Sequence, residues 1–262
     1  MRGLRAITAS LGLCLLAGCG SGGAGSQHAS AAGGSAQAGA NTVTVFAAAS
    51  LQETFSTLAA RYEAAHPNTT VKLNFGASSA LALQINAGAP ADVFASASVK
   101  NMTQVTSGGS ATNPVTFARN DMEIAVPPSN PARITAVRDL VKPGVKVTLC
   151  QAQVPCGATA VAVFSHAGVS VKPVTLEADV KSTLTKVELN EVDAGVVYRT
   201  DVRAAGAKVK GIEIPASLNA STDYPIAALT KAKNPDGAKS FLAFVQSAQG
   251  KSVLEAAGFQ QP

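Results

Sequence analysis

The sequence predicts an α/β protein of two lobes, each a mostly parallel sheet flanked by helices, with two chain crossings between the lobes. Strand and helix patterns alternate from residue 41 onward, which is typical of helices layered on a mostly parallel sheet. Two extended runs, 122–126 and 224–229, stand outside this alternation and are the expected crossings. Apolar residues, mostly Ala and Val, make up 47% of the chain. Such small side chains favour close packing of helices against a sheet.

The first lobe is expected to begin with a β-rich strand at 42–46. Apolar residues from Leu51 to Tyr62 then recur at helical spacing, and Pro67 follows an expected helix end at His66. The next expected elements are a strand at 71–75, a helix at 78–86 and a short buried strand at 92–95. An irregular stretch is expected from there to the first crossing.

The second lobe is expected between the two crossings. Its predicted elements are a strand at 146–149, helices at 158–166 and 180–188, and a strand at 194–198. The chain then returns to the first lobe and ends with a helix at 236–247. The predicted boundaries are therefore 42–122 with 223–262 for lobe 1, and 123–222 for lobe 2.

The N-terminus has the pattern of an export signal. Arg2 and Arg5 precede a short apolar stretch, and Leu16-Ala-Gly-Cys19 has the form of a lipobox. We expect residues 1–18 to be a lipoprotein signal peptide, Cys19 to carry lipid, and residues 19–41 to be a flexible linker rich in Gly, Ala and Ser. The expected location is outside the cytoplasm, anchored to the cell membrane. The alternative is an ordinary signal peptide with an incidental cysteine.

Charge and cysteine content narrow the function classes. The predicted signal peptide contains two of the 21 basic residues and none of the 16 acidic ones, so its removal lowers the net charge from +5 to +3. That mild, dispersed charge argues against a nucleic-acid-binding protein, which would need a dense basic patch. Cys150 and Cys156 are close in sequence in an exported chain, and we expect a disulfide. A thiolate metal site is the alternative, although no nearby His or third Cys completes it.

Four expected helix starts share small or hydroxyl residues. Helix N-termini offer unpaired N–H groups and partial positive charge, so several of them facing one cleft could hold a dianion without Lys or Arg. Taken singly, each start is also ordinary helix capping. The four segments are Ser50-Leu-Gln-Glu53, which has the form of a capping box, Gly76-Ala-Ser-Ser79, Val154-Pro-Cys-Gly157 and Asp179-Val180.

Several motifs resemble those of molybdate-binding proteins of ABC importers. In chain order they are Phe46-Ala-Ala-Ala-Ser50-Leu, Phe75-Gly-Ala-Ser78-Ser-Ala-Leu-Ala, Ala87-Gly-Ala-Pro-Ala-Asp92-Val-Phe-Ala-Ser96, Val154-Pro-Cys156-Gly157 and Gly195-Val-Val-Tyr198. The resemblance runs from about Val43 to Phe259. It implies the type II periplasmic-binding-protein fold, with molybdate or tungstate as ligand, no cofactor and no enzymatic activity. It also implies an ABC permease and its ATPase subunit as partners, and a monomer.

The resemblance also assigns a ligand set. It implies that the hydroxyls of Ser50 and Ser78, the backbone N–H groups of Cys156 and Val180, and the phenol of Tyr198 hold the anion. Molybdenum would be bound as an oxyanion, with no side chain ligating a metal ion directly. The family usually has Ala where Cys156 stands, which a backbone donor tolerates. The effect on binding of a disulfide at this position stays open.

The chemistry of molybdate agrees with such a donor set. Molybdate at neutral pH is a fully deprotonated dianion, so its site should offer only hydrogen-bond donors. A phosphate site, by contrast, gains from an acceptor for the phosphate proton; Asp179 is the carboxylate nearest the motifs, and we expect it to cap its helix. Sulfate satisfies the same donor-only rule, so a sulfate or other tetrahedral-oxyanion receptor is the main alternative.

Two other function classes remain as alternatives. Gly76-Ala-Ser78-Ser-Ala80 half resembles the nucleophile elbow of a serine hydrolase, and His166 follows it, but the final glycine of that motif is missing. A ferric-ion binder would be expected to use paired tyrosines, whereas Tyr62, Tyr198 and Tyr224 are scattered along the sequence.

Overall fold

The computed structural model describes residues 41–262 of the chain. The predicted signal peptide (1–18), Cys19 and the linker up to residue 40 lie outside the described residues. Within 41–262, nine strands form one sheet in the order β2-β1-β3-β9-β4-β7-β5-β6, and β8 pairs with β4. None of the helices in this region is long and apolar enough to cross a membrane.

The first half of the sheet order belongs to lobe 1. Strand β1 (Thr42–Ala48) pairs in parallel with β2 (Thr70–Gly76) and β3 (Val93–Ala95), and β3 pairs antiparallel with β9 (Ser221–Ala228). The helices of this lobe are η1 (Ala49–Leu51), α1 (Gln52–Ala65), α2 (Ser78–Asn86), α3 (Val99–Ser107), α7 (Pro235–Gln246) and α8 (Ala248–Ala257).

Lobe 2 repeats the strand arrangement of lobe 1. Strand β5 (Val147–Cys150) pairs in parallel with β6 (Thr175–Glu177) and β7 (Ala194–Tyr198), and β7 pairs antiparallel with β4 (Val115–Val126). The order β6-β5-β7-β4 therefore matches β2-β1-β3-β9, although the sequence contains no obvious repeat. The remaining elements are η2 (Val137–Val141), α4 (Pro155–Ala167), α5 (Val180–Glu188), α6 (Arg199–Ala205), η3 (Gly206–Lys208) and β8 (Lys210–Glu213).

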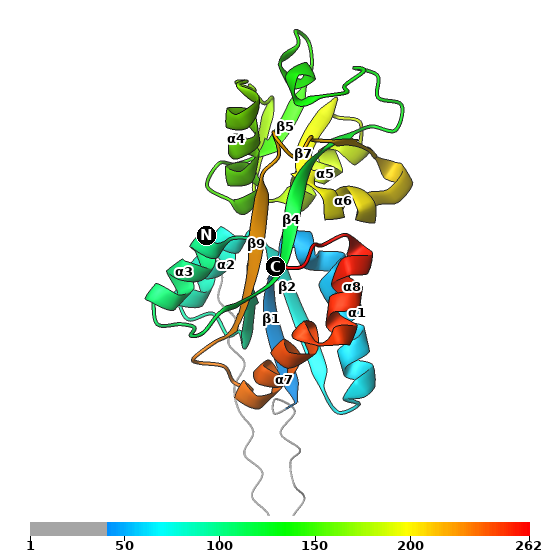
Figure 1. Cartoon of the computed structure of the whole chain (residues 1–262). Helices are drawn as coiled ribbons and strands as arrows, with labels where there is room; N and C mark the ends of the chain where they lie inside the picture. Colours follow the sequence, from blue (N-terminus) through cyan, green and yellow to red (C-terminus); the bar gives the residue numbers. More distant parts are fainter. Residues whose placement is uncertain (1–40) are drawn as a thin grey trace, which may run out of the picture. The chain divides into compact units, whose positions relative to one another are not determined.

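Strands β4 and β9 connect the two lobes. From Val115 to Asp121, β4 pairs with β9, and from Met122 to Ala125 it pairs with β7 (Figure 1). The change of partner occurs between adjacent residues, so a single strand passes from one lobe into the other. Strand β9 returns beside it. The two crossings predicted from sequence are therefore these two strands.

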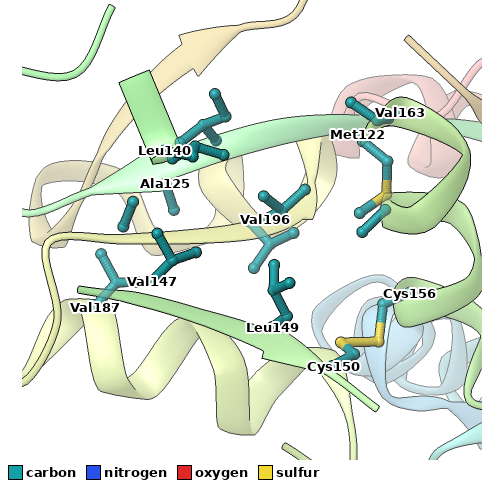
Figure 2. Packing of buried hydrophobic residues seen from close by; sticks show 14 of the residues in the cluster. Met122, Ala125, Leu140, Val147, Leu149, Cys150, Cys156, Val163, Val187 and Val196 are labelled. Atoms are coloured by element: carbon teal, nitrogen blue, oxygen red, sulfur yellow. A yellow bond between two sulfur atoms is a disulfide. The ribbon is translucent and has the colours of Figure 1, made fainter. Parts of the chain in front are cut away.

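Each lobe has its own apolar core. In lobe 2, buried residues of β4, β5 and β7, including Ala125, Leu149 and Val196, pack together, with Val163 of α4 and the Cys150–Cys156 disulfide at the edge of the cluster (Figure 2). In lobe 1, Phe55, Tyr62 and Phe241 are fully buried against the sheet. Because each core is largely complete within its lobe, the lobes are held to each other mainly by the two strands and by contacts around the pocket described below.

The expected strands and helices all form, and the structure adds several more. Helix α3 and the first half of β4 occupy the stretch expected to be irregular. The alternation of β4 is obscured by Arg119, Asn120 and Asp121, because this half of the strand lies where the lobes meet and carries polar contacts such as the Arg119–Asp223 ion pair at 2.8 Å. The elements β6, α6, β8 and α8 and the short helices η2 and η3 were also not expected.

Candidate anion-binding site

A small pocket lies where the two lobes meet. Lobe 1 contributes η1, the start of α2 and Ala97, and lobe 2 contributes the starts of α4 and α5 and the end of β7. All five residues assigned to the ligand from sequence line it: Ser50, Ser78, Cys156, Val180 and Tyr198. The pocket is small, with a cavity volume of about 20 Å³. This is little more than one water needs, so the pocket fits a compact group of few atoms.

The hydroxyl of Tyr198 is the group that indicates most clearly what kind of ligand the pocket would bind. Its oxygen is buried and has no hydrogen-bond partner within residues 41–262. The hydroxyls of Thr159 and Tyr224 lie nearby. Thr159 donates to the Pro155 carbonyl oxygen at 2.9 Å, and the Tyr224 oxygen lies 2.8 Å from Ser50 Oγ. Burial raises the pKa of Tyr198, so the phenol stays protonated at neutral pH. A buried donor without an acceptor is costly, and an anion in this pocket would supply the acceptor.

The Ser78 hydroxyl is oriented by the protein so that it can donate. Ser78 is fully buried, and its Oγ accepts a hydrogen bond from the Ala97 backbone N–H at 2.9 Å. Because this bond occupies an acceptor position, the hydroxyl proton of Ser78 is free to point elsewhere. Ser78 lies at the first position of α2, directly beside the pocket.

The Ser50 hydroxyl is held by a second buried tyrosine. Ser50 Oγ lies 2.8 Å from Tyr224 Oη, and Asn120 Nδ2 donates to the same Tyr224 oxygen at 3.4 Å. Asn120 Nδ2 also donates to Thr200 Oγ1, at 2.8 Å. If Asn120 donates to Tyr224 and Tyr224 to Ser50, the Ser50 proton remains available to the pocket. A chain of three donors then ends at the ligand.

The capping box predicted at Ser50 and Glu53 is wrong. Helix α1 has Leu51 at its N-cap and no side-chain capping bond. The Ser50 hydroxyl contacts Tyr224, and the Glu53 carboxylate pairs with Lys181 of α5 at 2.7 Å. Both side chains thus contact residues that are distant in sequence and do not cap the helix.

The helix starts at the pocket are largely uncapped. Among the described helices that line the pocket, η1, α2 and α4 have no side-chain capping bond, and α5 is capped by Asp179. Helix α1, outside the pocket, is also uncapped, whereas α3, α7 and α8 are capped by Ser98, Asn234 and Ser247. First-turn N–H groups have no acceptor within their own helix. The uncapped starts therefore direct several free donors, with partial positive charge, at one small volume.

Helix α4 contributes its donor through Cys156. Pro155 occupies the first position and has no N–H, so the Cys156 N–H is the first donor of the helix. The predicted disulfide is present: Cys156 is bonded to Cys150 at the end of β5. It fixes the first turn of α4 to the sheet. The next residue must be glycine, because a Cβ at Gly157 would lie 2.0 Å from the Gln151 carbonyl oxygen.

Helix α5 contributes Val180, and its cap behaves as predicted. Asp179 Oδ1 accepts a hydrogen bond from the Ser182 N–H at 2.9 Å, which leaves the Val180 N–H uninvolved in the cap. Asp179 also borders the pocket, with its carboxylate engaged at the helix start. None of the Lys and Arg residues between 41 and 262 lines the pocket, so the attraction that this part of the chain offers an anion comes from N–H and O–H dipoles.

The two alternative chemistries considered from the sequence were a serine hydrolase and a ferric-ion binder. His166 does not line the pocket, and its Nδ1 contacts the Asn219 carbonyl oxygen at 3.1 Å, so it makes no dyad with Ser78. Tyr198 and Tyr224 do pack together, with ring centroids 6.1 Å apart, but the Tyr224 hydroxyl contacts Ser50 Oγ and Tyr62 lies in the lobe 1 core. Residues 41–262 contain no cluster of three or more His, Cys, Asp or Glu side chains that could hold a metal ion.

Sequence reasoning missed the residues that support the ligand groups. Tyr224, Asn120 and Ala97 hold the two serines, yet nothing in their local sequence marks them. Asn120 and Tyr224 are 104 residues apart and meet only because β4 and β9 pair in antiparallel register. The only available signal was that Asn120 and Tyr224 lie within or beside the two predicted crossings.

Comparison with known proteins places the chain in a family. The family model described as "bacterial extracellular solute-binding protein" matches residues 43–260. The chain is 38% identical to the molybdate-binding protein ModA of Mycobacterium tuberculosis over 225 residues, covering 86% of each chain. It is 30% identical to the putative ABC transporter substrate-binding lipoprotein YvgL of Bacillus subtilis, covering 83% of this chain and 86% of that one.

A solved structure shows the same fold. The periplasmic molybdate-binding protein of Azotobacter vinelandii superimposes with a TM-score of 0.76 at 20% identity, over 84% of this chain and 99% of that one. Its similarity and the two-lobed sheet agree with the fold expected from sequence. The chain thus belongs to the bacterial extracellular solute-binding proteins, a family of binding proteins and not a class of enzymes, and it has their type II two-lobed α/β fold.

Proposed function

We propose that this chain captures molybdate, and tungstate with it, between its two lobes outside the cytoplasm and delivers the anion to an ABC importer. The observation that carries the proposal is the buried hydroxyl of Tyr198, which has no hydrogen-bond partner among the described residues. Tyr198 lines the pocket together with Ser50, Ser78 and the uncapped starts of η1, α2 and α4. Only an acceptor can satisfy all these donors together. The ModA relative at 38% identity supports molybdate as that acceptor.

The proposed ligand groups divide between the lobes. Ser50 and Ser78 come from lobe 1, and Cys156, Val180 and Tyr198 come from lobe 2. An anion that contacts both sets favours the arrangement in which the lobes are together, and exclusion of water strengthens each contact. The lobe boundaries that we propose are 42–122 with 223–262 for lobe 1 and 123–222 for lobe 2. The change of β4 partner between Asp121 and Met122 supports them.

The donor-only chemistry argues against phosphate. A hydrogen phosphate ion brings a proton that needs an acceptor. Among the described residues that line the pocket, Asp179 is the one acidic side chain, and the bond from the Ser182 N–H to its Oδ1 directs the carboxylate toward the first turn of α5. Sulfate carries no proton at neutral pH and meets the same donors. Sulfate is therefore the alternative ligand, and size decides between the two anions.

A thermal-shift comparison tests this proposal. Molybdate, tungstate, sulfate and phosphate would be added at matched ionic strength to the chain without its signal peptide. We expect molybdate and tungstate to raise the unfolding temperature by several degrees, because a ligand at 100 times its Kd stabilises by about 2.7 kcal/mol. Stabilisation by sulfate alone would assign the pocket to sulfate. Stabilisation by none of the four would refute an oxyanion site.

We further propose that the chain is a monomer tethered to the membrane through lipid on Cys19, without enzymatic activity. Its partners would be an ABC permease and the ATPase subunit of that permease. The lipoprotein named among the relatives supports the anchor. Palmitate labelling of the wild type that is lost in Cys19→Ala tests it, and equal labelling of both would contradict it. Hydrolysis of ester substrates that depends on Ser78 would contradict the absence of catalysis.

A further inference from the structure

Three charged side chains form a cluster that joins the lobes. Lys181 of α5 places its Nζ 2.7 Å from Glu53 Oε2 of α1 and 2.9 Å from Asp201 Oδ1 of α6. Asp201 is completely buried, Lys181 is 19% exposed and Glu53 is 50% exposed. Glu53 belongs to lobe 1, whereas the other two belong to lobe 2. The Glu53–Lys181 ion pair is therefore a contact across the lobe interface.

Each member of this cluster closely follows a proposed ligand group along the chain. Glu53 comes three residues after Ser50, Lys181 comes directly after Val180, and Asp201 comes three residues after Tyr198. Asp201 is also bonded back to its ligand residue, because its Oδ2 accepts a hydrogen bond from the Tyr198 N–H at 3.2 Å. The cluster thus connects three of the elements that present donors to the pocket.

The charge of the cluster does not explain its position. With all three groups ionised it is net negative, which disfavours a dianion nearby. Burial opposes the charge on Lys181, but Asp201 and Glu53 outweigh burial and raise the pKa of Lys181, so this lysine stays protonated. Attraction of the ligand is therefore not its role, and its geometry points to holding the lobes together.

We propose that the Glu53–Lys181 ion pair is an interlobe latch that slows release of the captured anion, with Asp201 as the residue that positions Lys181. The latch rests on the proposed function, because it acts on the same pocket. Opening the lobes would separate Glu53 from Lys181, whereas Asp201 and Lys181 would move together. The latch thus adds a barrier to opening without contacting the ligand.

The test is the release rate of molybdate from Glu53→Gln. Protein loaded with radioactive molybdate is mixed with excess unlabelled molybdate, and the bound label is followed over time. We expect release to be about two- to fivefold faster than from wild type, the range for a partly exposed ion pair. Glu53→Asp, which keeps the charge on a shorter side chain, is expected to fall between the two. Unfolding temperatures of the variants check that they are folded.

Glu191→Gln is the matched control. It also replaces a carboxylate by an amide. Glu191 Oε2 lies 3.0 Å from Nζ of Lys186, in an ion pair within lobe 2. Lys186 is on α5, the helix that carries Lys181. Release from this variant is expected to equal that of wild type. High salt gives a second readout, because the Debye length falls to about 3 Å at 1 M. The ratio of the Glu53→Gln rate to the wild-type rate should therefore approach one.

The outcomes separate the latch from the proposed function. A cluster acting through its net charge would give tighter binding and slower release in Glu53→Gln, and that result overturns the latch. Equal release from wild type and Glu53→Gln also overturns it, while leaving the molybdate site intact. A wild-type protein that retains no molybdate refutes the proposed function itself, and the latch on this ligand with it.

Discussion

Replacing Tyr198 by phenylalanine removes one oxygen atom from a side chain that is 1% exposed. The ring packs at 6.1 Å, centroid to centroid, from Tyr224, and phenylalanine can keep that contact. The lost hydroxyl has no hydrogen-bond partner in the described residues. Its removal therefore breaks no hydrogen bond of standard geometry among the described residues, and the substitution tests the hydroxyl as a donor to the ligand.

The two expected effects have opposite signs. A hydrogen bond to a charged group contributes about 1.5–3 kcal/mol, so molybdate affinity should fall roughly 10- to 150-fold. A buried hydroxyl without a partner costs about 1–3 kcal/mol. The ligand-free variant should therefore be more stable than the wild type, by about 1 kcal/mol. A residue that serves only the fold could not produce both results.

Two measurements test this prediction. Isothermal titration calorimetry gives the molybdate Kd, and urea unfolding without ligand gives the free energy of unfolding. Tyr62→Phe is the control, because Tyr62 is an equally buried tyrosine in the lobe 1 core and away from the pocket. Its molybdate affinity should match the wild type. An unchanged Kd in Tyr198→Phe would refute the role of the phenol as a ligand donor.

Three further predictions follow from the groups around the pocket. Tyr224→Phe should lower the free energy of unfolding by about 1–3 kcal/mol, because Asn120 and Ser50 lose the hydroxyl that both contact. It should weaken molybdate binding less than Tyr198→Phe does. A free energy of unfolding in urea equal to that of the wild type would contradict this prediction. The Cys150–Cys156 disulfide closes a loop of sequence separation 6, and its reduction should lower the free energy of unfolding by about 2 kcal/mol. An unfolding temperature unchanged by reductant would contradict this prediction. Burial raises the pKa of Asp201 from 3.8 to about 6, so ionising this group opposes folding. The wild type should therefore lose stability relative to Asp201→Asn as pH rises from about 4 to 7. A difference in free energy of unfolding between the two proteins that stays constant across that range would count against the raised pKa.

The sequence predicts helix starts well where the signal is local. Asp179 was expected to cap α5, and its carboxylate does so. A capping residue bonds to the first turn of its own helix, so a few neighbouring residues are enough to predict its role. The same holds for Pro155 at the start of α4 and for the disulfide, whose two cysteines are only six positions apart.

Prediction fails where a side chain is used by a distant part of the chain. Ser50 and Glu53 fit the local capping pattern, but neither caps the helix. Their side chains instead contact residues 174 and 128 positions away, Tyr224 and Lys181. Helix α3 was missed because most of its residues are polar and only Asn101, Met102 and Val105 are buried. Local signals were nevertheless present, because Ser98 caps the start of α3 and the apolar residues Val99, Met102 and Val105 recur every three positions.

The central claim is that a compact, donor-only pocket between the lobes holds molybdate. The most direct measurement is a crystal structure of the molybdate-soaked chain with anomalous scattering recorded at the molybdenum absorption edge. The account predicts one strong anomalous peak per molecule, within hydrogen-bonding range of Ser78, Val180 and Tyr198 through the oxygens of the anion. An anomalous peak elsewhere on the protein, with none in this pocket, would contradict it.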